Sequence, residues 1–109
     1  MTPEGRVKAN VKKQLLSFGQ DVWWFMPVQT GYGKAGVPDF VVCAGGFFLT
    51  IETKARGNNP TKLQDLCMKD IRSAGGTTLV INEDNLDEVK GTITWLLSQT
   101  YSGCRGCEG

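Results

Sequence analysis

Asp39, Glu52 and Lys54 are the residues of this 109-residue sequence whose types and spacing best fit a chemical site. If the two acids face each other on neighbouring strands, they repel unless a cation lies between them. Because side chains alternate along a strand, Lys54 shares the face of Glu52. Two carboxylates, with the backbone carbonyl of Thr53 as a further oxygen ligand, suit Mg²⁺ or Mn²⁺. With Lys54 orienting a water molecule or offsetting negative charge, such a site could hydrolyse the phosphodiester backbone of a nucleic acid.

A β-hairpin is the element that must bring these side chains together. Two apolar runs, at 39–43 and 47–54, flank a glycine-containing segment at 44–46, a pattern typical of strands joined by a tight turn. If the two glycines form the centre of the turn, Asp39 lies opposite Glu52. The alternative is a solvated hairpin end whose charges only avoid burial and prevent edge aggregation. The register and the flanking helices together favour the site.

The hairpin lies within a chain that predicts the element order α-β-β-β-α-β-α. The helical spacing of Val7, Val11 and Leu15 predicts the first helix, and aromatic and β-branched residues predict the strand after it. The expected elements are a helix at 3–18, strands at 22–26, 39–43 and 47–54, a helix from 59–60, a strand at 77–81 and a helix at 85–99. We therefore expect one α/β domain at 1–99 and a frayed tail at 100–109.

The two later helices have predicted caps and buried stripes. We expect Asn59 to cap the second helix and Pro60 to occupy its first position. Its predicted buried stripe is Leu63, Leu66, Cys67 and Ile71. The inward residues predicted for the last helix are Leu86, Val89, Ile93, Leu96 and Leu97.

Composition excludes several classes of function. The chain contains no histidine, which removes Ser-His and Cys-His catalysis and every zinc site that needs imidazole. With 40% hydrophobic and 21% charged residues it suits a globular domain, and no apolar stretch is long enough to span a bilayer, so no membrane partner is expected. The first residues lack the apolar segment of a secretory signal, so we expect a cytoplasmic protein. Basic residues predominate in 1–75, which predicts an anionic partner there.

Three short motifs in order carry a family resemblance: Gly36-Val37-Pro38-Asp39, Glu52-Thr53-Lys54 and Leu63-Gln64. With a glycine-turn hairpin between the first two, this set resembles the VRR-NUC family of the PD-(D/E)XK nuclease superfamily. The resemblance implies a restriction-endonuclease-like α-β-β-β-α-β core, with a mixed sheet flanked by helices and a further C-terminal helix. It also implies a divalent metal held by Asp39 and Glu52, a catalytic role for Lys54, and cleavage of DNA.

The resemblance extends to two further residues and to a partner. It implies that Gln64 positions water or the scissile phosphate, and that a glutamate on the first helix completes the metal shell. Glu4 is the candidate, although an acid in a first helical turn also simply complements the helix macrodipole. Stand-alone members of this size resemble phage-encoded nucleases, acting in the host cytoplasm, that form homodimers and cut branched, Holliday-junction-like DNA. The expected substrate is therefore branched or duplex DNA.

Other signals give competing hypotheses. Residues 31–36 match the dinucleotide fingerprint G-x-G-x-x-G, but Val37-Pro38 follows and favours extended chain over a helix, so no nucleotide cofactor is predicted. Cys104 and Cys107 supply half of a zinc site, which makes a small redox or zinc protein a third hypothesis. The second hypothesis is a catalytically inactive nucleic-acid-binding module that retains the nuclease fold, for which adding Mg²⁺ would change nothing.

Overall fold

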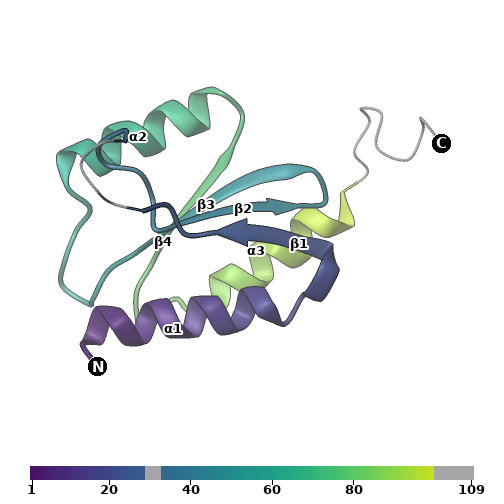
Figure 1. Ribbon diagram of the computed structural model, residues 1–109, viewed down its shortest axis with the longest axis horizontal. Coiled ribbons are helices and arrows are strands. Elements are labelled where there is room, and N and C mark those ends of the chain that lie inside the picture. Colours follow the sequence, from purple (N-terminus) through teal and green to yellow (C-terminus); the bar gives the residue numbers. More distant parts are fainter. Residues whose placement is uncertain (29–32, 100–109) are drawn as a thin grey trace.

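A four-stranded sheet organises the chain, with α1 and α3 on one face and α2 on the other (Figure 1). The computed structural model describes residues 1–28 and 33–99, so the predictions for 29–32 and for the tail with Cys104 and Cys107 lie outside it. The elements are α1 (Pro3–Leu16), a 3₁₀ turn (Gly19–Asp21), β1 (Val22–Phe25), β2 (Phe40–Ala44), β3 (Phe47–Thr53), α2 (Lys62–Ser73), β4 (Thr77–Ile81) and α3 (Asp87–Ser98). The strand order is β1-β2-β3-β4, antiparallel except for the parallel β3–β4 pair, which confirms the predicted mixed sheet and element order.

The β2–β3 hairpin has the predicted register. Gly45 and Gly46 both have positive φ, +62° and +88°, which a primed two-residue turn requires and which glycine adopts without steric cost. Ala44 therefore faces Phe47, and the pairing continues back to Phe40, the first residue of β2, which faces Ile51. Asp39 lies one residue before β2 instead of within it, and Lys54 lies one residue beyond β3. Both charged residues thus occupy the open end of the hairpin.

The core lies between the sheet and the pair α1 and α3. Helix α1 buries the predicted stripe of Val7, Val11 and Leu15. Helix α3 contributes the predicted inward residues, with Leu86 and Leu97 partly buried and Val89, Ile93 and Leu96 fully buried. The sheet supplies Phe40, Val42, Ala44, Leu49 and Ile51 from alternate positions of β2 and β3. This packing places the first turn of α1 beside the end of β3 and the loop after it (Figure 1).

Helix α2 differs from its prediction at its start and in its buried face. Thr61 is the N-cap, its hydroxyl accepts from the Gln64 N–H, and the Gln64 side chain accepts from the Thr61 N–H, so the predicted Asn59 cap and Pro60 first position are wrong. The capping box gives the backbone N–H groups of Thr61 and Gln64 hydrogen-bond acceptors, which a helix that starts at Pro60 would not provide. Of the predicted stripe, Cys67 is buried with Met68, Ile71 is partly buried, and Leu63 and Leu66 are 56% and 50% exposed. They are exposed because α2 packs mainly over β4 and turns Cys67 and Ile71, instead of Leu63 and Leu66, toward the sheet.

The uncovered part of this sheet face carries two rows of apolar side chains. Strand pairing aligns Trp23, Cys43 and Phe48 in one row. Phe25, Val41 and Thr50 form the next row. Trp23 is 65% exposed, Phe25, Cys43 and Phe48 are also exposed, and Val41 is partly buried. These five residues form a surface that we call the aromatic face, whereas Thr50 at its edge is buried. Since side chains alternate, Glu52 lies on the same face, two residues beyond Thr50.

Candidate active site

Glu52 is a buried acid at the end of β3. Its side chain is only 2% exposed, and its Oε2 lies 3.5 Å from the Nζ of Lys54. Its other oxygen, Oε1, is one of two buried side-chain oxygens in the described residues that lack a hydrogen-bond partner; the second is the Thr50 hydroxyl. An unpaired buried carboxylate oxygen costs free energy unless a ligand supplies the missing interaction. Glu52 is therefore the side chain around which a ligand site is most naturally built.

The environment of Glu52 raises its pKa from 4.5 to about 7. Burial is the largest cause, because it removes water from the charged form, and the negative charge of Asp39 adds to the effect. Lys54 opposes both through its positive charge and its hydrogen bond, and a small further increase comes from Glu4. The carboxyl group is thus poised near neutral pH, and a bound cation would favour its ionised form.

Asp39 is oriented by two donors from one residue. Its Oδ2 accepts hydrogen bonds from the backbone N–H of Thr53, at 2.9 Å, and from the Thr53 hydroxyl, at 2.6 Å. Thr53 is fully buried, so this double contact fixes the carboxylate of Asp39 at the edge of the site. From the sequence, Thr53 was expected only to offer its backbone carbonyl as a metal ligand, which stays a prediction. Its role as a hydrogen-bond donor to Asp39 was missed. The hydroxyl beside Glu52 was the available signal.

Helix α1 brings a second amine and a third acid to the same place. Thr2 caps the helix by accepting from the Gly5 N–H, which fixes Glu4 in the first turn. The Nζ of Lys8 lies 3.6 Å from Glu4 Oε2 and 3.8 Å from Asp39 Oδ1. Glu4 is therefore near the site but faces it through Lys8. Lys8 was not predicted, although its position four residues after Glu4 on a helix was visible in the sequence.

The backbone at Gln64 packs against Gly36, in the segment that leads to Asp39, while the amide oxygen of Gln64 caps the start of α2. Gly36 has φ +77°, and a Cβ there would lie 2.5 Å from the Leu63 carbonyl oxygen, so only glycine lets this segment approach the start of α2. The segment leading to Asp39 is thereby held against the first turn of the helix. The Oε1 of Gln64 accepts from the Thr61 N–H at 2.8 Å. Its role toward water or phosphate stays a prediction.

The residues present fit a hard divalent cation held by two carboxylates. Asp39 and Glu52 supply oxygen ligands, and the unpartnered Oε1 of Glu52 supplies a free ligand atom. Within residues 1–28 and 33–99, no three acids, cysteines or histidines come close enough to form a cluster of metal ligands. A site with two protein ligands is typical of Mg²⁺, which keeps several waters and takes phosphate as a further ligand.

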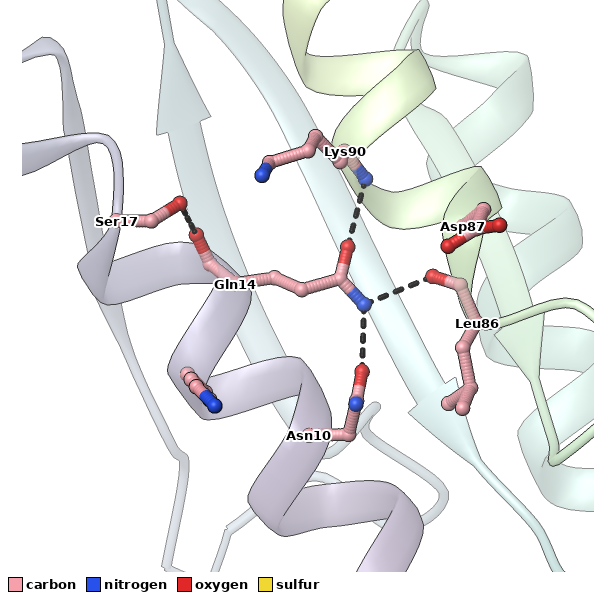
Figure 2. Close-up of a pocket in the computed structure, with 7 residues that line it drawn as sticks. Asn10, Gln14, Ser17, Leu86, Asp87 and Lys90 are labelled. Carbon is pink, nitrogen blue, oxygen red and sulfur yellow. Dashed lines mark hydrogen bonds between the residues drawn. The ribbon is translucent and has the colours of Figure 1, made fainter.

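A separate polar pocket between α1 and α3 has the character of a structural contact (Figure 2). It is lined by Asn10, Lys13, Gln14, Ser17, Leu86, Asp87 and Lys90. The amide of Gln14 donates to Asn10 Oδ1 at 2.7 Å and to the Leu86 carbonyl at 2.8 Å, and accepts from the Lys90 N–H at 3.0 Å. Helix α3 has no side-chain cap of its own, so Gln14 supplies hydrogen bonds to its first turn. Neither of the two buried side-chain oxygens that lack a hydrogen-bond partner in the described residues belongs to this pocket.

Across the described ranges, none of the helices is both long and apolar enough to cross a membrane. This finding agrees with the amphipathic character of all three helices, each of which has an exposed polar face.

Comparison with known proteins identifies the fold of the chain. No family model matches the sequence, and no curated protein matches it. A solved structure described as a VRR_NUC domain superposes with a TM-score of 0.69 at 22% sequence identity. The match covers 84% of this chain and 97% of that structure. The chain therefore has the fold of a VRR_NUC domain, as the motifs around Asp39, Glu52 and Lys54 led us to expect.

Proposed function

We propose that this VRR_NUC-like chain is a metal-dependent DNA endonuclease that hydrolyses phosphodiester bonds at Asp39, Glu52 and Lys54. The observation that carries the proposal is the buried Glu52, with its unpartnered Oε1, between Asp39 and Lys54. A structural acid would have both oxygens paired or exposed to water. The likeness to a VRR_NUC domain supports the same reaction class.

Four residues of the site, Asp39, Glu52, Thr53 and Lys54, have distinct roles in the proposed mechanism. A bound Mg²⁺ or Mn²⁺ would polarise the phosphate and lower the pKa of a water molecule. Asp39 and Glu52 would hold the ion, and Thr53 keeps the Asp39 carboxylate in place through two hydrogen bonds. Lys54, whose Nζ lies 3.5 Å from Glu52, offsets the negative charge that develops on the phosphate or orients the attacking water.

Basic residues near the site suit an anionic backbone. Arg6, Lys12 and Lys13 are exposed along α1, whose first turn adjoins the carboxylates. Exposed lysines that contact phosphates make binding strongly dependent on salt. We therefore propose that DNA runs along the exposed side of α1, with affinity that falls steeply between about 50 and 200 mM salt.

The direct test of the proposal compares Lys54→Ala with the wild-type protein. Cleavage of duplex, single-stranded, flap and four-way DNA is measured with Mg²⁺ and with Mn²⁺, and DNA binding is measured separately. We expect Lys54→Ala to lose turnover while keeping measurable binding, and Lys90→Ala, which changes an exposed lysine on α3, to retain full activity. Unchanged turnover in Lys54→Ala would remove that lysine from the mechanism. Binding without metal-dependent cleavage by the wild type would leave an inactive binding module.

A second copy of the chain is the partner that the aromatic face fits. Its two rows contain no charged side chain, which disfavours a nucleic-acid backbone, and its large exposed rings resemble the centre of a protein interface. Strand β1 also forms an edge of the sheet, so its outer side is open to pairing in the described residues. We propose a homodimer through this face, which would place two sites in one assembly suited to branched DNA.

The dimer is tested by mass in solution. The wild type is expected to elute with twice its 11.9 kDa mass, and Trp23→Glu as a monomer. Trp95 is equally exposed but lies on α3, away from the aromatic face, so Trp95→Glu should leave the dimer intact. A monomeric wild-type protein at high concentration would contradict the dimer without affecting the proposed chemistry.

A further inference from the structure

We propose that Lys8 is a built-in counter-ion that occupies the space between Glu4 and Asp39 where a second divalent cation would otherwise bind, so that each chain takes up one metal ion. This inference rests on the proposed metal-dependent function and specifies the number of ions that the site accepts. Glu52 and Asp39 would hold the bound ion, and the ammonium group of Lys8 lies between Glu4 and Asp39, where a second ion would need to bind.

The geometry of Lys8 is that of a shared cation. Its Nζ lies at nearly equal distances from two carboxylates, 3.6 Å from Glu4 Oε2 and 3.8 Å from Asp39 Oδ1. Both distances exceed the usual length of a charge-assisted hydrogen bond, about 2.7–2.9 Å, so the amine is not committed to either partner. It bridges two acids that come from different elements, one on α1 and one just before β2.

The contact with Asp39 separates this arrangement from an ordinary helix-surface pair. Glu4 and Lys8 are four residues apart on α1, and such pairs stabilise a helix by about 0.3–0.5 kcal/mol without any wider role. An isolated helix pair, however, has no reason to reach a carboxylate that two hydrogen bonds from Thr53 already hold in the site. Asp39 Oδ2 is used by Thr53, and Lys8 faces the remaining oxygen, Oδ1.

The charges of the site are nearly balanced without a second ion. Glu4, Asp39 and Glu52 are three acids, and Lys8 and Lys54 are two amines, each within 4 Å of at least one of them. Lys54 faces Glu52, and Lys8 faces Glu4 and Asp39. Adding one divalent ion makes this set of five side chains net positive, which suits a phosphate but repels another divalent ion.

Calorimetric titration of the full-length protein with Mn²⁺, without DNA, tests the inference. The wild type is expected to bind one ion per chain. Lys8→Met should bind two, because Glu4 and Asp39 are then left without a counter-ion. Lys8→Arg keeps the positive charge and should bind one, and so should Lys12→Met, which removes an exposed lysine one turn further along α1. The double variant Glu4→Gln/Lys8→Met should return to one ion. Circular dichroism confirms that each variant is folded.

The outcomes separate this inference from the proposed function. Two ions in the wild type, or one ion in folded Lys8→Met, would overturn the role of Lys8 and leave the nuclease proposal standing. No Mn²⁺ uptake by the folded wild type would overturn the proposed metal-dependent function itself.

Discussion

Two polar clusters contact α1, one near each end of the helix, and they satisfy their polar groups in opposite ways. Near the C-terminal end, both atoms of the Gln14 amide are used, in three hydrogen bonds to Asn10, Leu86 and Lys90. Near the N-terminal end, the acids face two lysines at longer distances, and Glu52 keeps one buried oxygen without a partner. Both clusters are polar and partly enclosed, so enclosure alone does not distinguish a site.

The difference lies in what each cluster would gain from a ligand. The Gln14 amide joins α1 to α3 with both its oxygen and its nitrogen in hydrogen bonds, so it stabilises the fold (Figure 2). The Glu52 cluster carries an acid whose pKa is raised to about 7 by burial, so it destabilises the protein when ionised. A bound cation would stabilise the ionised form of Glu52 and so offset the free energy that its burial costs. The following predictions separate the two clusters.

The largest expected effect is on cleavage by Glu52→Gln. Loss of a metal ligand removes several kcal/mol of transition-state stabilisation, so we expect DNA cleavage to fall about a thousandfold. The measurement is the single-turnover cleavage rate with saturating Mg²⁺. Activity within tenfold of the wild type would show that Glu52 does not hold the ion.

The same acid predicts how stability depends on pH in the absence of metal. Because the pKa of Glu52 is raised in the folded state, from 4.5 to about 7, the folded protein binds the extra proton between these values. Stability should therefore fall by about 3 kcal/mol as pH rises through this window and then level off. Urea unfolding in EDTA at pH 5 to 8 measures it. Glu52→Gln should flatten the profile, and an equal decline in that variant would assign the effect to another group.

Gln14→Leu is expected to produce the reverse pattern. Removing the amide leaves the Lys90 N–H without its acceptor and takes from the Leu86 carbonyl one of its two donors, the other being the Val89 N–H, which costs about 2 kcal/mol of unfolding free energy. Cleavage per folded molecule should stay at the wild-type level. Urea denaturation combined with the cleavage assay gives both values. A loss of activity in folded Gln14→Leu would mean that the two clusters are coupled through α1.

Thr53→Val tests the positioning of Asp39 and carries the smallest expected effect. The variant keeps the backbone N–H contact and removes the 2.6 Å hydroxyl contact. Loss of such a supporting hydrogen bond typically reduces metal affinity or activity by about 10- to 100-fold. Thr53→Ser should restore most of the activity because it returns the hydroxyl. If Thr53→Val has full activity and full Mn²⁺ affinity, the backbone N–H alone orients Asp39.

Much of the fold could be predicted from local pattern. The paired glycines fixed the turn and hence the hairpin register, and the spacing of Val7, Val11 and Leu15 identified the inner face of α1. The start of α2 was missed because Pro60 is a strong helix-start signal, whereas the capping box of Thr61 and Gln64 is the stronger physical interaction. Leu63 and Leu66 follow a helical period yet are exposed, since which part of a sheet a helix covers depends on tertiary packing.

The candidate site was predicted as a set of residue types but not as a network. The proximity of Glu52 and Lys54 follows from strand alternation and is observed at 3.5 Å. Outside the site, the predicted start of the last helix at Asn85 is wrong, because α3 begins at Asp87. The side chain of Asn85 instead accepts from the Asn82 N–H and donates to the Val80 carbonyl. The roles of Thr53 and Lys8 depend on contacts between segments far apart in the chain. No local pattern encodes those contacts.

The central claim is that Asp39 and Glu52 hold one divalent ion at the unpartnered oxygen of Glu52. It is tested most directly by anomalous diffraction from crystals of the protein soaked in Mn²⁺. We expect a single strong peak bonded to Glu52 Oε1 and to a carboxylate oxygen of Asp39, and no peak there in Glu52→Gln. Well-ordered Asp39 and Glu52 side chains with no Mn²⁺ between them at saturating metal would contradict the account.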